Sequence, residues 1–166
     1  MGHRECPADE GCAEMMRARL NEALRQALER RDEVAVTTLR LILAALKDRD
    51  LAARGRGAAD EGIADHEILD MLQEMVHQRR EAIEVYEQGG NTELARREAE
   101  EIAYIEQFLP RQLGEPETTA AVDEVIGEVG AGGLKDMGRV MAVLRDRYAG
   151  RMDFVRASTI AKEHLR

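Results

Sequence analysis

Four side chains in the middle of the chain have the types and the spacing of a metal-binding helix face. They recur at intervals of four, three and four residues, which places them on one side of a helix: Asp70, Glu74, His77 and Glu81. The Glu74 and His77 pair has the i, i+3 spacing found in carboxylate-bridged di-iron bundles. Such bundles need a second Glu-x-x-His pair, and the chain contains none. We therefore interpret this set as a solvated helix face, and we expect no metal and no other cofactor.

Nucleophiles and nucleotide-binding loops are scarce in this sequence. The single serine, Ser158, has no second serine with which to build an amidase site, and Cys6 and Cys12 have no neighbours that would lower a thiol pKa. The glycine-rich segment 130–133 follows a helical pattern rather than a strand and lacks the later glycine and lysine of a phosphate-binding loop. We expect no catalytic residue and no catalytic activity from the chain alone.

The last 32 residues reverse the charge of the chain. The whole sequence has a formal net charge of −9, yet residues 135–166 hold eight Lys or Arg against four Asp or Glu. Cations spaced along helices can contact several backbone phosphates without reading sequence. We therefore take as candidate RNA-binding residues Lys135, Arg139, Arg145, Arg147, Arg151, Arg156, Lys162 and Arg166. The alternative is an ordinary solvated helical surface that the four acids dilute.

Aromatic side chains are too few for recognition by base stacking. The chain has no Trp and only 3% aromatic residues, and Tyr148 and Phe154 are the two in the basic region. Single-stranded RNA is usually held on aromatic platforms, whereas folded RNA is recognised through its shape and backbone. If this region binds RNA, we expect it to bind a folded RNA.

Apolar residues recur with the 3.6-residue period of α-helices, and no segment alternates with the period of a strand. We predict an all-α fold with an N-terminal four-helix unit, residues 15–110, whose long third helix spans about 65–88. Asp32 and Asn91 have the residue types and positions of N-caps for the second and fourth helices, and Pro110 is expected to end the fourth. Residues 1–14 are predicted to be a disordered leader.

Details of packing in this first unit follow from the same periodicity. Leu28 falls on the apolar stripe of the first helix, and Arg79 falls near the core stripe of the third. Arg80 can pair with Glu84 one turn further along that helix.

Residues 111–166 predict a small second domain of three helices. Gly114 and Pro116 open it, Gly130 and Gly150 separate its helices, and Asp153 has the position of an N-cap for the last helix. Gly138 lies inside the middle helix, where glycine is unfavourable, so we expect a close helix crossing there.

Several segments of the chain resemble those of a known protein family and occur in the same order. They are Thr38-Leu39-Arg40-Leu41 followed by Ala44-Ala45-Leu46-Lys47, Gln78-Arg79-Arg80-Glu81-Ala82-Ile83, Phe108-Leu109-Pro110 with Gln112-Leu113, Lys135-Asp136-Met137-Gly138-Arg139-Val140-Met141, and Tyr148-Ala149-Gly150-Arg151-Met152-Asp153. Together they resemble the stand-alone YqeY-like branch of the GatB/YqeY family, whose C-terminal domain is similar to the tail of the B subunit of aspartyl/glutamyl-tRNA amidotransferase.

The resemblance implies a noncatalytic accessory protein that binds transfer RNA through the C-terminal domain, or that associates with the amidotransferase or another protein handling transfer RNA. Carbon-nitrogen ligation with glutamine as amide donor would belong to the chain only by that association. A helical protein-protein adaptor without RNA binding is the alternative. No apolar run reaches the ~20 residues of a membrane span, and the N-terminus lacks the apolar region of a secretory signal. We expect a cytoplasmic protein with no membrane partner.

Overall fold

The computed structural model describes residues 13–57 and 62–166, and these residues form seven α-helices, a short 3₁₀ turn and no strand. The all-α prediction is confirmed. The chain divides into an N-terminal unit that ends at Phe108 and a C-terminal unit, Leu109–Arg166. Residues 1–12 of the predicted leader lie outside the described part, and helix α1 begins at Ala13. None of the described helices has the length and apolar character needed to cross a membrane.

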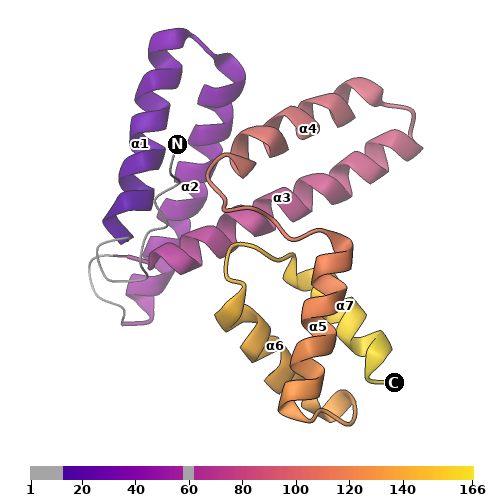
Figure 1. The fold of residues 1–166 in the computed structure, drawn as a ribbon. Coiled ribbons are helices and arrows are strands. Elements are labelled where there is room, and N and C mark those ends of the chain that lie inside the picture. Colours follow the sequence, from indigo (N-terminus) through magenta and orange to yellow (C-terminus); the bar gives the residue numbers. More distant parts are fainter. Residues whose placement is uncertain (1–12, 58–61) are drawn as a thin grey trace, which may run out of the picture. The chain divides into compact units, whose positions relative to one another are not determined.

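Two helical hairpins make up the N-terminal unit (Figure 1). The first pairs α1 (Ala13–Arg30) with α2 (Glu33–Gly55), and the second pairs α3 (Asp65–Gln88) with α4 (Thr92–Glu106). The carboxylate of Asp32 accepts a hydrogen bond from the Ala35 N–H, and the Asn91 side chain accepts one from the Leu94 N–H. Both predicted caps therefore stabilise the starts of their helices by satisfying amides that have no partner inside the helix.

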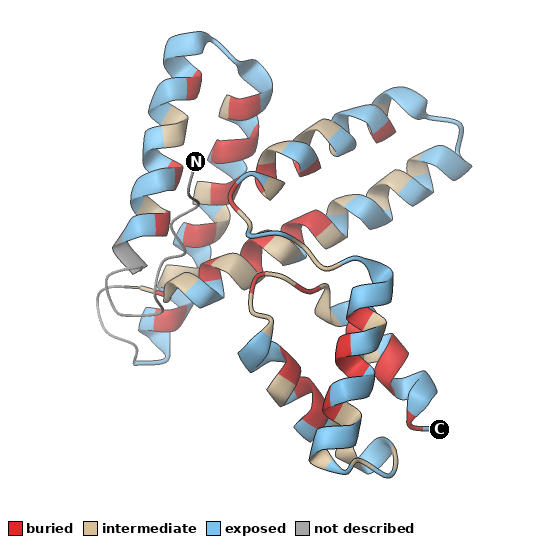
Figure 2. Cartoon of the chain, in the orientation of Figure 1, coloured by how far each residue is buried: buried red, intermediate tan, exposed pale blue. Residues whose placement is uncertain are grey.

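The core of this unit lies along the inner faces of its helices, as Figure 2 shows in red. Its largest fully buried side chains are Leu20, Leu39, Ile42, Ile68, Met71, Leu72 and Ile105. The predicted place of Leu28 in the stripe of α1 is wrong, since 49% of this residue is exposed. The helical period places Leu28 in the apolar stripe, but in the structure this residue lies at the edge of the stripe, in the last turn of α1 before the hairpin bend.

Two other predictions for the N-terminal unit need correction. Helix α4 ends at Glu106 rather than at Pro110, because the chain leaves the helix through a turn in which the Phe108 N–H donates to the Ile105 carbonyl. The guanidinium of Arg80 pairs with Glu106 of α4 at 3.0 Å, not with Glu84 on its own helix. A hairpin neighbour thus replaces the pair expected along one helix.

Three helices form the C-terminal unit: α5 (Glu115–Val129), α6 (Met137–Arg147) and α7 (Phe154–His164). Gly130 ends α5 in the left-handed conformation at φ 64°, and a 3₁₀ turn, η1 (Leu134–Asp136), leads into α6. Met152, in the loop before α7, is fully buried with Val122, Val125 and Leu144. The small unit thus has its own apolar core.

Gly138 does not mark a close helix crossing. A Cβ atom built on it meets no other atom within 4 Å, and the residue is exposed near the start of α6. The predicted crossing is therefore wrong: the family-like segment around Gly138 tolerates a side chain in the space that the structure provides.

Candidate nucleic-acid interface

Helix α5 is the acidic element of the C-terminal unit. It carries five Asp or Glu and no Lys or Arg, whereas the Lys and Arg of the region after it are on η1, α6, α7 and the adjoining loops. Gly114 and Pro116 start the helix, and acidic residues in its first turn are favoured by the exposed amides there. The unit therefore contains an acidic helix packed against two helices that carry most of its cations.

Ion pairs connect α5 to both basic helices. Arg147 of α6 forms a two-pronged pair with Glu128, and Arg156 of α7 approaches the Glu115 carboxylate at 2.6 Å. The hydrogen bonds from Arg147 are the main cause that lowers the pKa of Glu128. Part of the charge reversal seen in the sequence is thus neutralised inside the C-terminal unit.

Two further candidate cations are held by contacts within the unit. The Arg139 guanidinium donates to the carbonyl of Val129 at the end of α5 and lies 3.3 Å from the Asp136 carboxylate. The Arg145 guanidinium lies over the ring of Phe154, 5.8 Å from its centroid. A cation over an aromatic face is attracted by the ring electrons, so Arg145 also orients a side chain at the start of α7.

The remaining four candidates form no ion pair among the described residues: Lys135, Arg151, Lys162 and Arg166. Lys135 is exposed on η1, and Arg151 is half-buried in the loop before α7, where its backbone carbonyl accepts a hydrogen bond from the Leu113 N–H. Of the eight residues that sequence reasoning proposed, these four and Arg145 have no carboxylate partner among the described residues, and Arg145 differs from the four in its contact with the Phe154 ring.

Two of these cations lie at the C-terminal end of α7, one inside the helix and one just beyond it. Lys162 lies in the last turn of α7 and Arg166 lies two residues beyond the end of the helix at His164, and both are exposed. Val155 and Thr159 are exposed on the same side of the helix as Lys162. The buried side of α7 holds Ala157, Ile160 and Ala161, so the outward side is free of the core. We call Val155, Thr159, Lys162 and Arg166 the α7 outer face. It offers two cations and the Thr159 hydroxyl group, which donates to the Val155 carbonyl at 3.2 Å.

The metal-like residues of α3 are engaged in other contacts. Glu74 pairs with Arg49 of α2, and the His77 ring lies 3.2 Å from the Glu81 carboxylate. Within the residues that the structure describes, no group of three His, Cys, Asp or Glu has the arrangement of a metal site. Cys6 and Cys12 lie outside those residues.

Arg79 is a structural residue of the α3–α4 hairpin. Its guanidinium donates to the Glu101 carboxylate at 2.7 Å and to the Met75 carbonyl at 3.1 Å, and only 12% of its side chain is exposed. Glu98 lies nearby at 3.9 Å, and burial is the main cause that raises the pKa of this carboxyl. The near-core position predicted for Arg79 is therefore accounted for by packing between two helices.

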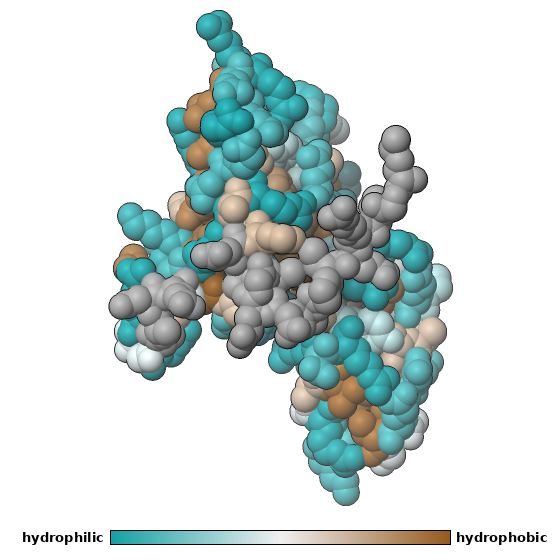
Figure 3. All heavy atoms as spheres, turned by 60° about the vertical axis from the view of Figure 1, so that its left-hand side comes forward, coloured by the Kyte–Doolittle hydropathy of each residue, from teal (hydrophilic) through white to brown (hydrophobic). Residues whose placement is uncertain are grey.

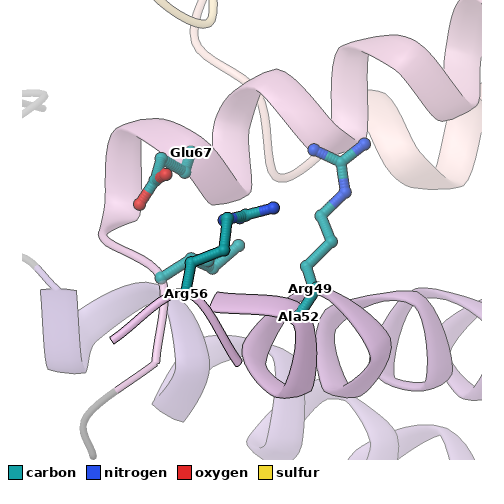
Figure 4. A pocket seen from close by; sticks show the side chains of 5 residues that line it. Arg49, Ala52, Arg56 and Glu67 are labelled. Atoms are coloured by element: carbon teal, nitrogen blue, oxygen red, sulfur yellow. The ribbon is translucent and has the colours of Figure 1, made fainter. Parts of the chain in front are cut away.

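A shallow pocket of about 240 Å³ lies between the end of α2 and the start of α3. Figure 4 shows the Arg49 side chain extending from α2 toward α3, with Arg56 just after the end of α2 and Glu67 at the opposite rim. The Glu67 carboxylate accepts a hydrogen bond from the Ala64 N–H at 2.8 Å, and Arg49 is paired with Glu74. These groups serve helix capping and helix pairing, and none of the pocket residues is a nucleophile.

Sequence reasoning did not find the acids that compensate the candidate cations. The sequence does contain a signal for these acids, because every charged residue of the α5 segment is acidic, whereas the following segment has more basic than acidic residues. Periodicity places each charge on the surface of its own helix, but it does not say which surfaces of two helices face each other. The pairs of Arg147 with Glu128 and of Arg156 with Glu115 depend on that packing.

Comparison with known proteins agrees with the YqeY-like part of the resemblance. Residues 17–165 match the family described as Yqey-like protein, which covers α1 to α7 apart from the first residues of α1. The chain belongs to the YqeY-like protein family. The match extends across both units, so the acidic helix α5 and the basic helices after it are parts of the YqeY-like region.

Two curated fungal relatives carry the name "Altered inheritance of mitochondria protein 41, mitochondrial". The protein of Lachancea thermotolerans is 25% identical over 114 residues, which are 68% of this chain and 58% of the relative. The protein of Eremothecium gossypii is 27% identical over 92 residues, which are 55% of this chain and 48% of the relative. The matched region of this YqeY-like chain thus spans about half the length of these relatives.

Proposed function

We propose that this YqeY-like protein is a noncatalytic accessory factor that binds transfer RNA through its C-terminal unit. The observation that carries the proposal is the α7 outer face, where Lys162 in the last turn of α7 and Arg166 just beyond the helix are exposed and form no ion pair with the described carboxylates. Their spacing suits contacts with a phosphate backbone, and Lys135 and Arg151 add charge in the same unit. Unlike Arg147 and Arg156, these cations need not leave an internal partner to meet a phosphate.

The composition of this surface favours a folded RNA over a single strand. Phe154 is partly buried and covered by Arg145, and Tyr148 packs against the core of the unit. Neither ring is available as a platform for stacked bases. Backbone contacts by cations and hydroxyl groups recognise the shape of a folded RNA, and transfer RNA is the member of that class that the family resemblance suggests.

Association with a transfer RNA amidotransferase is the partner relation that this proposal includes. The resemblance of the C-terminal unit to the tail of the amidotransferase B subunit supports it, and carbon-nitrogen ligation with glutamine as amide donor would then be performed by the associated enzyme. The curated relatives' name refers to mitochondrial inheritance and to no molecular activity. The proposal therefore rests on the charge arrangement and on the resemblance.

A filter-binding titration of the full chain with transfer RNA tests this function. Four contacted phosphates predict a slope of roughly −3 to −4 when log affinity is plotted against log salt concentration. Unstructured RNA of equal length should bind more weakly, because it lacks the folded shape. Absence of transfer RNA binding at both low and physiological salt would remove the RNA proposal. A partner that stays bound after nuclease treatment would instead support the adaptor alternative.

A further inference from the structure

Helix α2 has an outward side that no other described helix covers. Its inward residues, among them Leu39, Ile42 and Leu46, are buried in the core of the N-terminal unit. The opposite side contains an exposed series of mostly apolar or small residues, which we call the α2 seam: Val34, Thr37, Leu41, Ala44, Asp48 and Leu51. In Figure 3, apolar surface reaches solvent at the height of the α1–α2 hairpin.

The spacing of the α2 seam is that of a coiled coil. Its members follow one another at alternating intervals of three and four residues, which keeps them on one line along the helix. The three large members, Val34, Leu41 and Leu51, are 42%, 45% and 53% exposed. Single exposed apolar residues are common on proteins, but three in heptad register along one helix form a surface that a second helix can bury.

Cations border one edge of this seam. Arg40 and Lys47 each directly precede a seam residue and are exposed. The equivalent position one heptad earlier holds an acid, Glu33, so the two cations lie along the middle and the C-terminal part of the seam. In coiled coils, charged residues at this flanking position choose the partner by pairing with opposite charges on the facing helix. The N-terminal unit is acidic as a whole, so these cations set the α2 edge apart from the surrounding surface.

We propose that the α2 seam docks an amphipathic helix of a partner protein that carries acidic residues opposite Arg40 and Lys47. A second copy of this chain fits less well, because an antiparallel pair of seams would place Arg40 and Lys47 against the same cations of the other copy. A lipid surface also fits less well, because Asp48 interrupts the seam and no aromatic residue anchors it. The proposal concerns the N-terminal unit and does not depend on RNA binding by the C-terminal unit.

Two designed peptides test the proposal with the full-length chain. Both are 21-residue helices with leucine at the seam-facing heptad positions; one has glutamate opposite the α2 cations, and the other has lysine. In fluorescence anisotropy, with each labelled peptide kept dilute enough to stay monomeric, the acidic peptide should bind and the basic peptide should bind at least about tenfold more weakly. The double substitution Leu41→Asp with Leu51→Asp should reduce binding of the acidic peptide at least about tenfold.

Val85→Asp provides the matched control, because Val85 is an exposed apolar residue of α3 outside the seam. This variant should bind the acidic peptide like the original chain, and circular dichroism should show unchanged helicity in all variants. Equal binding of both peptides, or binding that survives the seam substitutions, would overturn the proposal. Failure of the acidic peptide to bind would also overturn it if the chain instead formed a dimer in sedimentation analysis, or adsorbed to anionic vesicles, and the seam substitutions abolished that behaviour.

Discussion

A polar cluster around Arg17 joins the start of α1 to the end of α2 and to the residues just before α3. The Arg17 guanidinium donates to both oxygens of the Asp50 carboxylate at 2.7 Å and to the Ile63 carbonyl at 2.9 Å. The same carboxylate accepts a hydrogen bond from the Ile63 N–H at 2.9 Å. Three separate parts of the chain thus meet at one partly buried ion pair, and charge-assisted hydrogen bonds of this kind are among the stronger ones in proteins.

Gly62 is required by this cluster. It has a φ of 81°, and a Cβ atom on it would lie 2.8 Å from the Arg17 Nη2 atom and closer still to the Asp50 carboxylate. We predict that Gly62→Ala lowers the free energy of unfolding by at least ~1 kcal/mol more than Gly90→Ala does. Gly90 is the control because its φ of 73° is similar and its surroundings are open. Urea denaturation measures the free energy of unfolding of both variants. Equal losses of stability would show that the Arg17 cluster can move aside for the new methyl group without a loss of stability.

The Asp50 carboxyl gives the N-terminal unit a defined pH dependence. The hydrogen bonds from Arg17 are the main cause that lowers its pKa below the ordinary value of 3.8. A carboxyl with a lowered pKa in the folded state contributes stability above its unfolded pKa, and this contribution is lost as pH falls through the folded pKa. We predict that Asp50→Asn costs about 1 to 3 kcal/mol at pH 7 and progressively less below pH 3.8.

Denaturation curves of the original chain and the Asp50→Asn variant at neutral and acidic pH provide the measurement. Glu22→Gln is the matched control, because Glu22 also pairs with an arginine, Arg25, but does so at the exposed surface. This control should leave stability unchanged within error, as exposed pairs generally contribute little. An Asp50→Asn effect that stays constant between pH 7 and pH 3 would contradict the role assigned to its charge.

At the scale of elements, the sequence predicts where helices begin and end better than what their surfaces meet. The bounds expected for the third helix agree with Asp65–Gln88, and the caps Asp32, Asn91 and Asp153 all form. Caps and periodicity are local properties, so they can be read from neighbouring residues.

The predictions that failed required knowledge of neighbouring elements. Arg80 meets Glu106 because α4 folds back on α3, and Gly138 faces open space because no helix crosses α6 there. Likewise, the division of the candidate cations into paired and unpaired groups follows from how α5 packs on α6 and α7. The sequence spacing of residues within one helix does not tell which other helix those residues face.

Substitution of Gly138 tests the corrected environment of α6. Since its Cβ position is empty and helical, we predict that Gly138→Ala raises the free energy of unfolding by about 0.5 kcal/mol. The gain arises because alanine loses less backbone entropy than glycine on entering a helix. Thermal unfolding followed by circular dichroism gives the measurement. A destabilised variant would mean that a neighbouring element does approach Gly138, as the sequence pattern alone suggested.

At the scale of the molecule, charge is distributed by unit and then by helix. The net charge of −9 arises from residues before the C-terminal unit, because residues 109–166 contain equal numbers of acidic and basic residues. Within that unit, the acids of α5 neutralise part of the cations of α6 and α7, and the α7 outer face retains its own. The RNA binding that we propose therefore involves a small surface rather than the whole basic segment.

The transfer RNA affinities of two double variants distinguish the α7 outer face from the cations that are paired within the unit. Lys162→Gln with Arg166→Gln removes the unpaired cations of the α7 outer face, while Arg139→Gln with Arg147→Gln removes the same charge from residues engaged within the unit. We predict that the first variant loses at least about tenfold in affinity at physiological salt and reduces the salt slope by about 2, whereas the second changes both far less. Equal losses in the two variants, or no loss in the first, would contradict the account.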